Sequence, residues 1–296
     1  MPRPQLRPLR SRSRRRPGFA GRPAFTLVEL IVAVGVIALL LGIVTVVAAS
    51  ARKSAGATRE LALARSLMAA YSGYSVDNRG SLLPGFYNVT PALPTPSDGK
   101  GNTISGPAAH RYPWRLAPFL DYNLDALIQD RWLLDDLRYT NQFEYFVSLY
   151  PSLGLNTTFL GGDSSSEGLG FSPAFASLYG NFYLRRMSEA RRPAELITFA
   201  SARTNAPYEP GAPPIIEGYF KVESPFLLNR RWAESWDPEQ LPKQWGFLSM
   251  RHPGRKAAVG FLDGHTGLLD DGAVTDMRRW ADRADRPDWT LVPSVP

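Results

Sequence analysis

The apolar positions of this chain begin with one uninterrupted run, residues 25–49, in which Glu29 is the single charged residue. At ~1.5 Å of rise per residue, a helix over this run is long enough to cross a hydrocarbon core of ~30 Å. Placing an acid in a bilayer core costs on the order of 2.5–3.5 kcal/mol on insertion scales. The pattern therefore predicts a membrane-spanning helix in which Glu29 serves a function.

The pattern changes after residue 49, where polar side chains such as Arg52 and Lys53 appear. Apolar or small positions then recur in steps of three and four, which is the spacing of an amphipathic helix. These positions are Ala57, Leu61, Ala64, Met68, Tyr71 and Tyr74. No proline lies between Phe25 and Pro84, so we predict one continuous helix from about residue 25 to 74. Its second half, residues 50–75, is expected to pack its apolar stripe on a globular domain.

The rest of the chain, residues 76–296, is predicted to form that domain. Prolines and glycines mark residues 76–118 as a loop region with turns. We expect helices over 124–139 and 273–284, and either a helix or a strand over 143–150. Strands are expected at 182–187, 196–200, 219–222, around Val259 and Phe261, and at 265–269, with Asp263-Gly264 as a two-residue hairpin turn. The prediction is an α+β fold, with the long helix packed on a small antiparallel sheet that has long loops.

The net charge of +7 comes from the first residues of the chain. Residues 1–24 hold eight arginines and no lysine or acid, so without them the charge falls from +7 to −1. Nucleic-acid binding is therefore not expected of the main body, because phosphate binding needs clustered Lys and Arg. A basic segment before an apolar run stays in the cytoplasm. This orientation places the N-terminus in the cytoplasm and the C-terminal domain outside it. The chain has no cysteine, which excludes disulfides and thiolate metal sites.

The junction between the basic segment and the apolar run carries a family resemblance. Residues Ala24 to Leu30 (AFTLVEL), with arginines upstream and an apolar helix downstream, resemble the cleavage and N-methylation signal of type IV pilins and type II secretion pseudopilins. The family usually has glycine before the cut, where this chain has Ala24. The alternative interpretation of this segment is an ordinary signal anchor that contains Glu29.

The resemblance implies a processed and assembled protein. A prepilin peptidase would remove residues 1–24, cutting between Ala24 and Phe25, and would methylate the new N-terminal amine of Phe25. Glu29 would pair with the N-terminal amine of a neighbouring subunit, in agreement with the rule that buried charges are tolerated as pairs. The implied partners are other pilin or pseudopilin subunits, an inner-membrane assembly platform and membrane lipid. The implied fold is pilin-like, on a single-pass inner-membrane protein of a pseudopilus or pilus.

A weaker resemblance lies near the C-terminus. His252 is followed by ten residues and then by Asp263-Gly264. This order is similar to that of a bacterial subset of pilin-like proteins with a His, about nine residues and an Asp-Gly. His252 precedes Pro253 and Gly254, where it is expected to cap or brace the hairpin.

Two clusters of residues suggest other chemistry. Asp263, Asp270 and Asp271, near His252 and His265, are the candidate ligands if the chain binds a cation such as Ca²⁺. We favour a structural role, because Asp263 is explained by turn chemistry. Trp232, Trp236 and Trp245 could form an exposed patch for glycan or a protein partner, but buried packing is the favoured interpretation. No catalytic residue and no cofactor site is predicted, since no nucleophile–base order or nucleotide loop is present.

The sequence thus predicts a prepilin-like subunit of a type II secretion pseudopilus or a type IV pilus. The alternative is a binding module tethered to the membrane, whose extracytoplasmic domain captures glycan or secreted cargo. A membrane-anchored hydrolase is the third possibility, and it needs an acid–base pair in a pocket.

Overall fold

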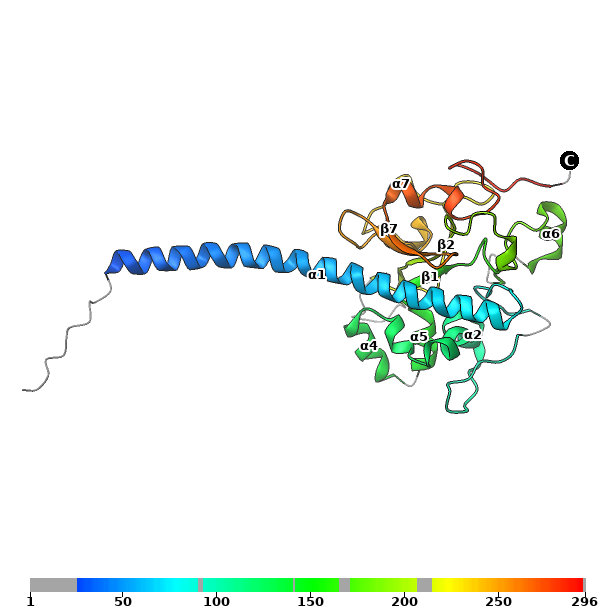
Figure 1. The fold of residues 1–296 in the computed structure, drawn as a ribbon, viewed down its shortest axis with the longest axis horizontal. Coiled ribbons are helices and arrows are strands. Elements are labelled where there is room, and N and C mark those ends of the chain that lie inside the picture. The colour runs from blue at the N-terminus through cyan, green and yellow to red at the C-terminus, as the bar shows by residue number, and fades with distance from the viewer. Residues whose placement is uncertain (1–25, 90–92, 141, 165–170, 207–214, 295–296) are drawn as a thin grey trace, which may run out of the picture. The chain divides into compact units, whose positions relative to one another are not determined.

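A computed structural model describes residues 26–89, 93–140, 142–164, 171–206 and 215–294. The chain divides into two compact units, Met1–Ala49 and Ser50–Pro296. Helix α1 is a single helix over Leu27–Asp77, so the predicted continuous helix is confirmed (Figure 1). By length and composition α1 is able to cross a membrane. In the single chain, the side chains of residues 27–45 and 47–49 are all exposed.

The second unit is built on a five-stranded sheet in the order β5-β1-β2-β6-β7. The bounds of these strands are Leu153–Asn156 (β1), Ile197–Ser201 (β2), Lys221–Val222 (β5), Ala257–Phe261 (β6) and Thr266–Leu269 (β7). A separate antiparallel pair joins β3 (Thr204–Asn205) to β4 (Ile215–Ile216).

The prediction of an antiparallel sheet is wrong at one edge. Neighbouring strands are antiparallel except for β1 and β5, which run parallel, so the sheet is mixed. A long connection separates β1 from β5, and no hairpin forces the two to run in opposite directions. The α+β class is otherwise present, with one long helix and a small sheet.

The remaining helices are short, and α2, α4 and α5 gather on one side of the later part of α1, opposite β7 and α7 (Figure 1). The α-helices are α2 (Gly106–His110), α3 (Tyr112–Leu116), α4 (Arg131–Arg138), α5 (Phe143–Leu149), α6 (Pro173–Tyr179) and α7 (Asp271–Val274). The 3₁₀ turns are η1 (Ala117–Leu120), η2 (Leu124–Leu127), η4 (Met187–Glu189), η5 (Pro242–Trp245) and η6 (Met277–Arg279).

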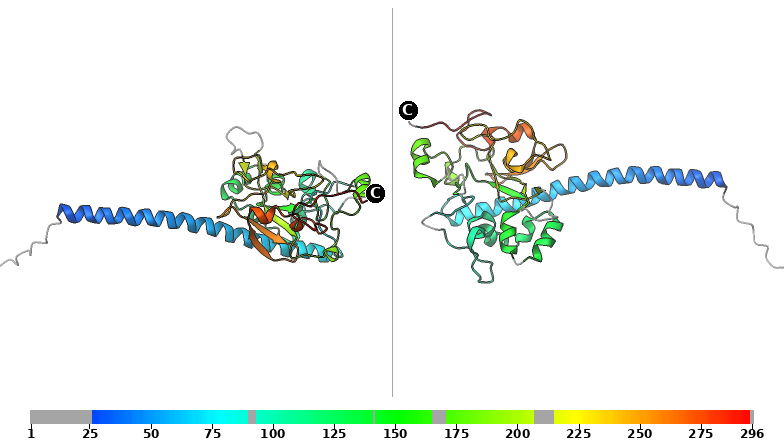
Figure 2. Two further views of the ribbon diagram at one scale, coloured as in Figure 1. Left: turned by 90° about the horizontal axis from the view of Figure 1, so that it is seen from above. Right: turned by 180° about the vertical axis from the view of Figure 1, so that it is seen from behind.

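The second half of α1 lies directly on the sheet (Figure 2). Gly260 of β6 makes this close approach possible, because a Cβ there would lie 2.8 Å from Met68 Cγ. Tyr71 packs edge-on against Phe199 of β2, with ring centroids 5.7 Å apart. The predicted stripe is therefore the packing face, although Leu61 and Tyr74 are only partly buried.

The sheet separates two apolar clusters. One contains the α1 residues Leu63, Leu67 and Met68, together with leucines of the short helices. The other contains Ala257, Val259 and Phe261, alternate residues of β6, with Trp232, Trp245 and Trp280. This alternation is the period of two that a strand imposes. The small residues Ala258 and Gly260 take the intervening positions.

Three predicted elements differ from the structure, and in two of them side chains cap the backbone. Asp130 accepts hydrogen bonds from the backbone N–H groups of Trp132 and Leu133, which starts α4 afresh and divides the helix expected over 124–139. Asp276 similarly accepts from Arg278 N, so the helix expected over 273–284 is two short segments, α7 and η6. Residues 182–187 form single bridges rather than a strand.

The hairpin between β6 and β7 is present, but its turn is longer than predicted. The connection covers residues 262–265, and Gly264 N donates to Phe261 O. A two-residue type I′ turn needs positive φ at both central residues. Here Gly264 has φ +97 whereas Asp263 does not have positive φ. The strands expected at 196–200 and 219–222 are confirmed as β2 and β5, and residues 143–150 adopt the helical alternative as α5.

Shortening a buried side chain at the interface between α1 and the sheet should lower the free energy of unfolding strongly. Leu67 is fully buried there. We expect Leu67→Ala to lower the free energy of unfolding by about 2–5 kcal/mol, because it removes buried methyl groups and leaves a cavity. The measurement is urea unfolding of the full chain in detergent. The matched control is Leu228→Ala, a leucine that is 46% exposed. Equal destabilisation by the two variants would contradict the packing described.

Candidate functional site

Glu60 is a charged residue of α1 that faces the sheet and is only 2% exposed. It shares the packing stripe with Ala57 and Ala64, three and four residues away, so the helix itself turns its carboxylate toward the sheet. Ser201 of β2 donates a hydrogen bond from Oγ to Glu60 Oε1 at 2.7 Å. Ser201 is in turn held by the backbone N–H of Ala258 in β6, at 2.8 Å.

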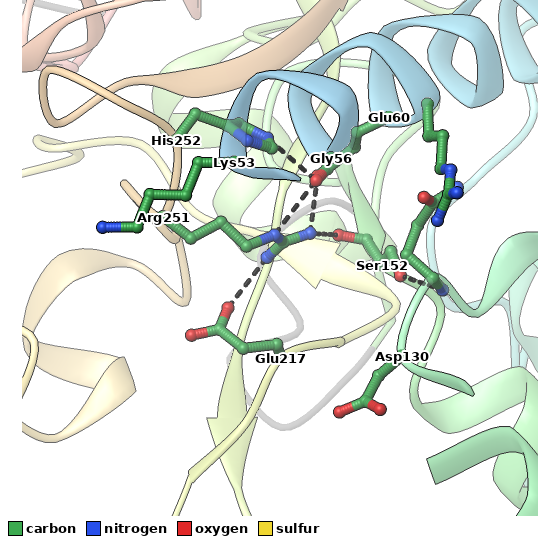
Figure 3. Close-up of a pocket in the computed structure, with 10 residues that line it drawn as sticks. Lys53, Gly56, Glu60, Asp130, Ser152, Glu217, Arg251 and His252 are labelled. Atoms are coloured by element: carbon green, nitrogen blue, oxygen red, sulfur yellow. Dashed lines mark hydrogen bonds and ion pairs between the residues drawn. The ribbon is translucent and has the colours of Figure 1, made fainter. Parts of the chain in front are cut away.

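Arg251, which lies shortly before β6, is the main partner of Glu60 (Figure 3). Its Nη2 donates to Glu60 Oε1 at 2.5 Å and its Nε to Oε2 at 3.0 Å, which is a two-point contact. The remaining donors reach Ser152 O at 2.8 Å, Ala202 O at 2.9 Å and Glu217 Oε2 at 2.8 Å. All five N–H donors of the guanidinium are thus used.

His252 and Glu217 complete the cluster. His252 Nε2 lies 2.9 Å from Glu60 Oε2, within ion-pair distance but outside hydrogen-bonding geometry. The backbone of His252 pairs with that of Lys256 across a tight turn. Glu217 Oε2 also accepts a hydrogen bond from Ser249 Oγ at 2.6 Å. The Glu217 side chain is 40% exposed, so it connects the buried pair to the solvent.

The electrostatics of the cluster favour the charged forms. Burial on its own would raise the pKa of Glu60, but Arg251, His252 and Ser201 outweigh it and hold that pKa below its usual value. Burial would lower the pKa of Arg251, but Glu60 and Glu217 keep it above its usual value. The pair is therefore an ionised salt bridge, in which the Glu60 side chain is 2% exposed and the Arg251 side chain 19% exposed.

A cavity of about 280 Å³ lies beside the cluster. It is lined by Lys53, Gly56, Arg59, Glu60, Gln129, Asp130, Ser152, Glu217, Arg251 and His252. The charged side chains of the cluster bind one another rather than pointing a free group into this space (Figure 3). Ser201, the hydroxyl nearest to Glu60, has no exposed surface and cannot reach a substrate. The arrangement is suited to fastening α1 to the sheet, and we call Glu60, Arg251, His252 and Glu217 the clamp.

The predicted assembly residue, Glu29, lies in the first turn of α1. Its Oε2 accepts hydrogen bonds from Thr26 N and Thr26 Oγ1, both at 2.9 Å, and Thr26 Oγ1 accepts from Glu29 N at 3.2 Å. This reciprocal arrangement is a capping box. The predicted cleavage residues, Ala24 and Phe25, lie outside the described residues.

The structure does not bring the C-terminal motif together as a unit. His252 contacts Glu60, whereas Asp263 Oδ1 lies 2.6 Å from His265 Nδ1 and accepts from His265 N. Gly264 provides the positive φ of the turn. His252 contacts Lys256 in its own turn and Glu60 of α1, so the expected bracing of the β6–β7 hairpin stays a prediction.

The candidate cation ligands likewise contact different residues and do not converge on one point. Asp270 caps α7 by accepting from Ala273 N at 3.0 Å, and Asp271 pairs with Arg255 at 2.5 Å. In the part of the chain that the structure describes, no three His, Cys, Asp or Glu side chains are grouped to hold a metal ion. Of the three tryptophans considered, Trp232 and Trp245 are buried as favoured, and Trp236 is partly buried.

The clamp is not among the sites predicted from the sequence. Glu60 is one of the polar residues that follow the apolar run, and no role was predicted for Glu60, Arg251 or Glu217. The signal was available in the spacing: Ala57, Glu60 and Ala64 follow the three-four step of the stripe, which puts an acid where a hydrophobic residue is expected.

Comparison of the chain with protein-family models finds no match, and comparisons with curated proteins and with solved structures find none either.

Removing one partner of the clamp should be costly. We expect Glu60→Gln to lower the free energy of unfolding by about 1.5–3 kcal/mol, because it removes the charge-assisted contacts of Glu60 and leaves Arg251 with Glu217 as its counter-ion. The measurement is urea unfolding of the full chain. The matched control is Glu195→Gln, which removes a carboxylate that is 52% exposed from its ion pair with Arg192. We expect that control to change the free energy by about 0–1 kcal/mol.

The clamp should also make the free energy of unfolding depend on pH in the acid range. Since the pKa of Glu60 is lowered on folding, its contribution is complete above its usual value of 4.5 and is lost as pH falls through the folded-state pKa. The difference in unfolding free energy between wild type and Glu60→Gln should therefore shrink below pH 4.5. A difference that stays constant from pH 7 to the acid range would show that Glu60 is not an ionised partner.

Proposed function

We propose that this chain is a prepilin-like subunit of a type II secretion pseudopilus or a type IV pilus. In this proposal a prepilin peptidase removes residues 1–24 and methylates Phe25. Before assembly, the subunit is anchored in the inner membrane with its C-terminal domain outside the cytoplasm. Assembly brings the apolar helices of neighbouring subunits together in the filament core.

The observation that carries the proposal is a lone carboxylate in the first turn of a helix that is able to cross a membrane. Glu29 uses Oε2 for Thr26, and within the described residues its Oε1 makes no hydrogen bond. One oxygen therefore remains available to a positively charged group from outside the chain. In a bilayer such a carboxylate is tolerable when it is paired. A neighbouring N-terminal amine supplies the charge and the N–H donors that the pairing requires.

The clamp supports the same proposal. A subunit that assembles through its helix must hold its globular domain to that helix. The buried contacts of Glu60 with Arg251 and Ser201 join the second half of α1 to the sheet. In the alternative, the helix only tethers a binding module to the membrane, and such a tether would not need this joint. The burial of Trp232 and Trp245 also removes most of the aromatic surface on which that alternative relied.

Glu29 should be required for assembly and not for membrane insertion. We expect Glu29→Gln to remain in the membrane fraction but to enter filaments on the order of a hundredfold less, because the neighbour's amine is left buried without a counter-ion. The measurement is the ratio of subunit in sheared filaments to subunit in membranes. Glu195→Gln, an exposed acid of the globular unit, is the control. Normal incorporation of Glu29→Gln would contradict the assigned role.

A further inference from the structure

A second cavity, also of about 280 Å³, is lined by residues of the segment 87–106 and of helices α2 and α3. Among the described residues, its lining includes one arginine, Arg115, but no lysine and no acid. The cavity beside the clamp differs, because the acids of its lining equal the arginines and lysine in number. The apolar part of the second cavity consists of Val89, Leu93, Pro96, Ile104 and Ala109. The other side chains of the lining are neutral hydroxyl and amide groups and the imidazole of His110.

Arg115 is a partly buried cation that the described part of the chain leaves without a counter-ion. There its one hydrogen bond runs from Nη1 to Pro94 O at 3.3 Å. Its Nε is buried and has no hydrogen-bond partner. Burial lowers the pKa of Arg115, and the groups that oppose this shift are the phenols of Tyr74 and Tyr87 rather than a carboxylate. Arg251, in contrast, uses all five of its N–H donors.

The surrounding sequence explains why no acid reaches Arg115. From residue 87 to residue 116 the chain contains a single acid, Asp98. The Asp98 carboxylate accepts hydrogen bonds from the backbone N–H groups of Lys100 and Asn102 and from Asn102 Nδ2, at 2.7–3.0 Å. It is therefore engaged within its own turn. A cation that is desolvated without a counter-charge is costly, and an anionic ligand in the cavity would offset that cost.

The backbone that carries Arg115 is fixed in place. Tyr112 donates from Oη to Leu153 O at 2.6 Å, and Trp114 donates from Nε1 to Glu144 O at 2.8 Å. Every other residue of α3 is buried. The guanidinium is thus held at the cavity before any ligand arrives, which reduces the entropy lost on binding.

We propose that this cavity binds a monocarboxylate that carries a small apolar group, with the carboxylate on Arg115 and the apolar group against Leu93 and Ile104. The planar fork of a guanidinium matches the two oxygens of a carboxylate. One guanidinium also balances one negative charge, whereas a phosphate monoester carries more than one at neutral pH. The volume lies near the lower end of the range of ~300–1,000 Å³ that is usual for ligand pockets, so the ligand is small.

Two sources supply this chemistry, namely a free branched-chain acid and the C-terminal residue of a peptide. Both present a carboxylate next to a compact apolar group. All residues that line the cavity belong to the unit Ser50–Pro296. The inference therefore does not rest on membrane insertion or on filament assembly.

The test measures binding to the full chain in an uncharged detergent at neutral pH, by titration with ligand-observed saturation-transfer NMR. The probes are 3-methylbutanoate for the free acid, N-acetylvaline for the peptide C-terminus, 3-methylbutanamide as the neutral isostere, and inorganic phosphate. Arg115→Gln removes the charge at the cavity. The matched control is Arg131→Gln, which changes an exposed arginine of α4 outside the cavity.

We expect both carboxylates to bind the wild type and the control at least about tenfold more tightly than the amide, because a charge-assisted hydrogen bond is lost in the amide. Arg115→Gln should lose this preference. Equal binding of acid and amide, no saturable binding of either carboxylate, tighter binding of phosphate, or an unchanged preference in folded Arg115→Gln would each overturn the proposal.

The comparison of acid with amide uses the unaltered protein, so it decides the proposal even where Arg115→Gln does not fold. The two carboxylates then distinguish the sources. Tighter binding of N-acetylvaline than of 3-methylbutanoate would support the proposal with a peptide C-terminus as the ligand. The reverse order would support it with a free acid.

Discussion

The buried ion pair between Glu60 and Arg251 is the interaction on which the globular unit depends. A helix that carries a carboxylate in its packing stripe can lie on a sheet only where the sheet supplies a counter-charge and hydrogen-bond donors. Arg251 supplies both, and Ser201 supplies a further donor. Because each of these bonds has a direction, α1 cannot rotate or slide on the sheet without breaking them. The pair therefore constrains the register of the helix on the sheet.

The packing around the pair follows from this register. With Glu60 placed over Ser201, Ala64 and Met68 meet β6 at Gly260, where a larger residue would not fit. Tyr71 then falls on Phe199. Ser152 and Ala202 contribute backbone carbonyls to Arg251, so the ends of β1 and β2 are joined to the same point. A single polar contact thus connects α1, the centre of the sheet and the segment before β6.

Two carboxylates of α1, Glu60 and Glu29, are in opposite situations. Glu60 is satisfied within its own chain by several donors, whereas Glu29 bonds to Thr26 of its own first turn. The fold therefore needs Glu60 and does not need Glu29. An acid that the fold does not need, in a helix able to enter a membrane, is explained when another molecule supplies its partner. This contrast is the physical basis of the proposed assembly role.

Much of the architecture was predictable from local patterns. The long helix, strand β2 and the β6–β7 hairpin each have a clear period or a turn signal close by in sequence. The errors arose where a contact outside the apolar period decides the outcome. The parallel pairing of β5 depends on residues distant in sequence, whereas the break before α4 comes from the local cap by Asp130. The role of Glu60 was not predicted, because its partner Arg251 lies 191 residues away.

The most direct test of the account is mass spectrometry of the N-terminus of the protein isolated from its native membranes. The account predicts a chain that begins at Phe25 with a methylated amine. An unprocessed N-terminus, or a cut elsewhere that leaves Phe25 internal, would contradict the assignment to the prepilin class.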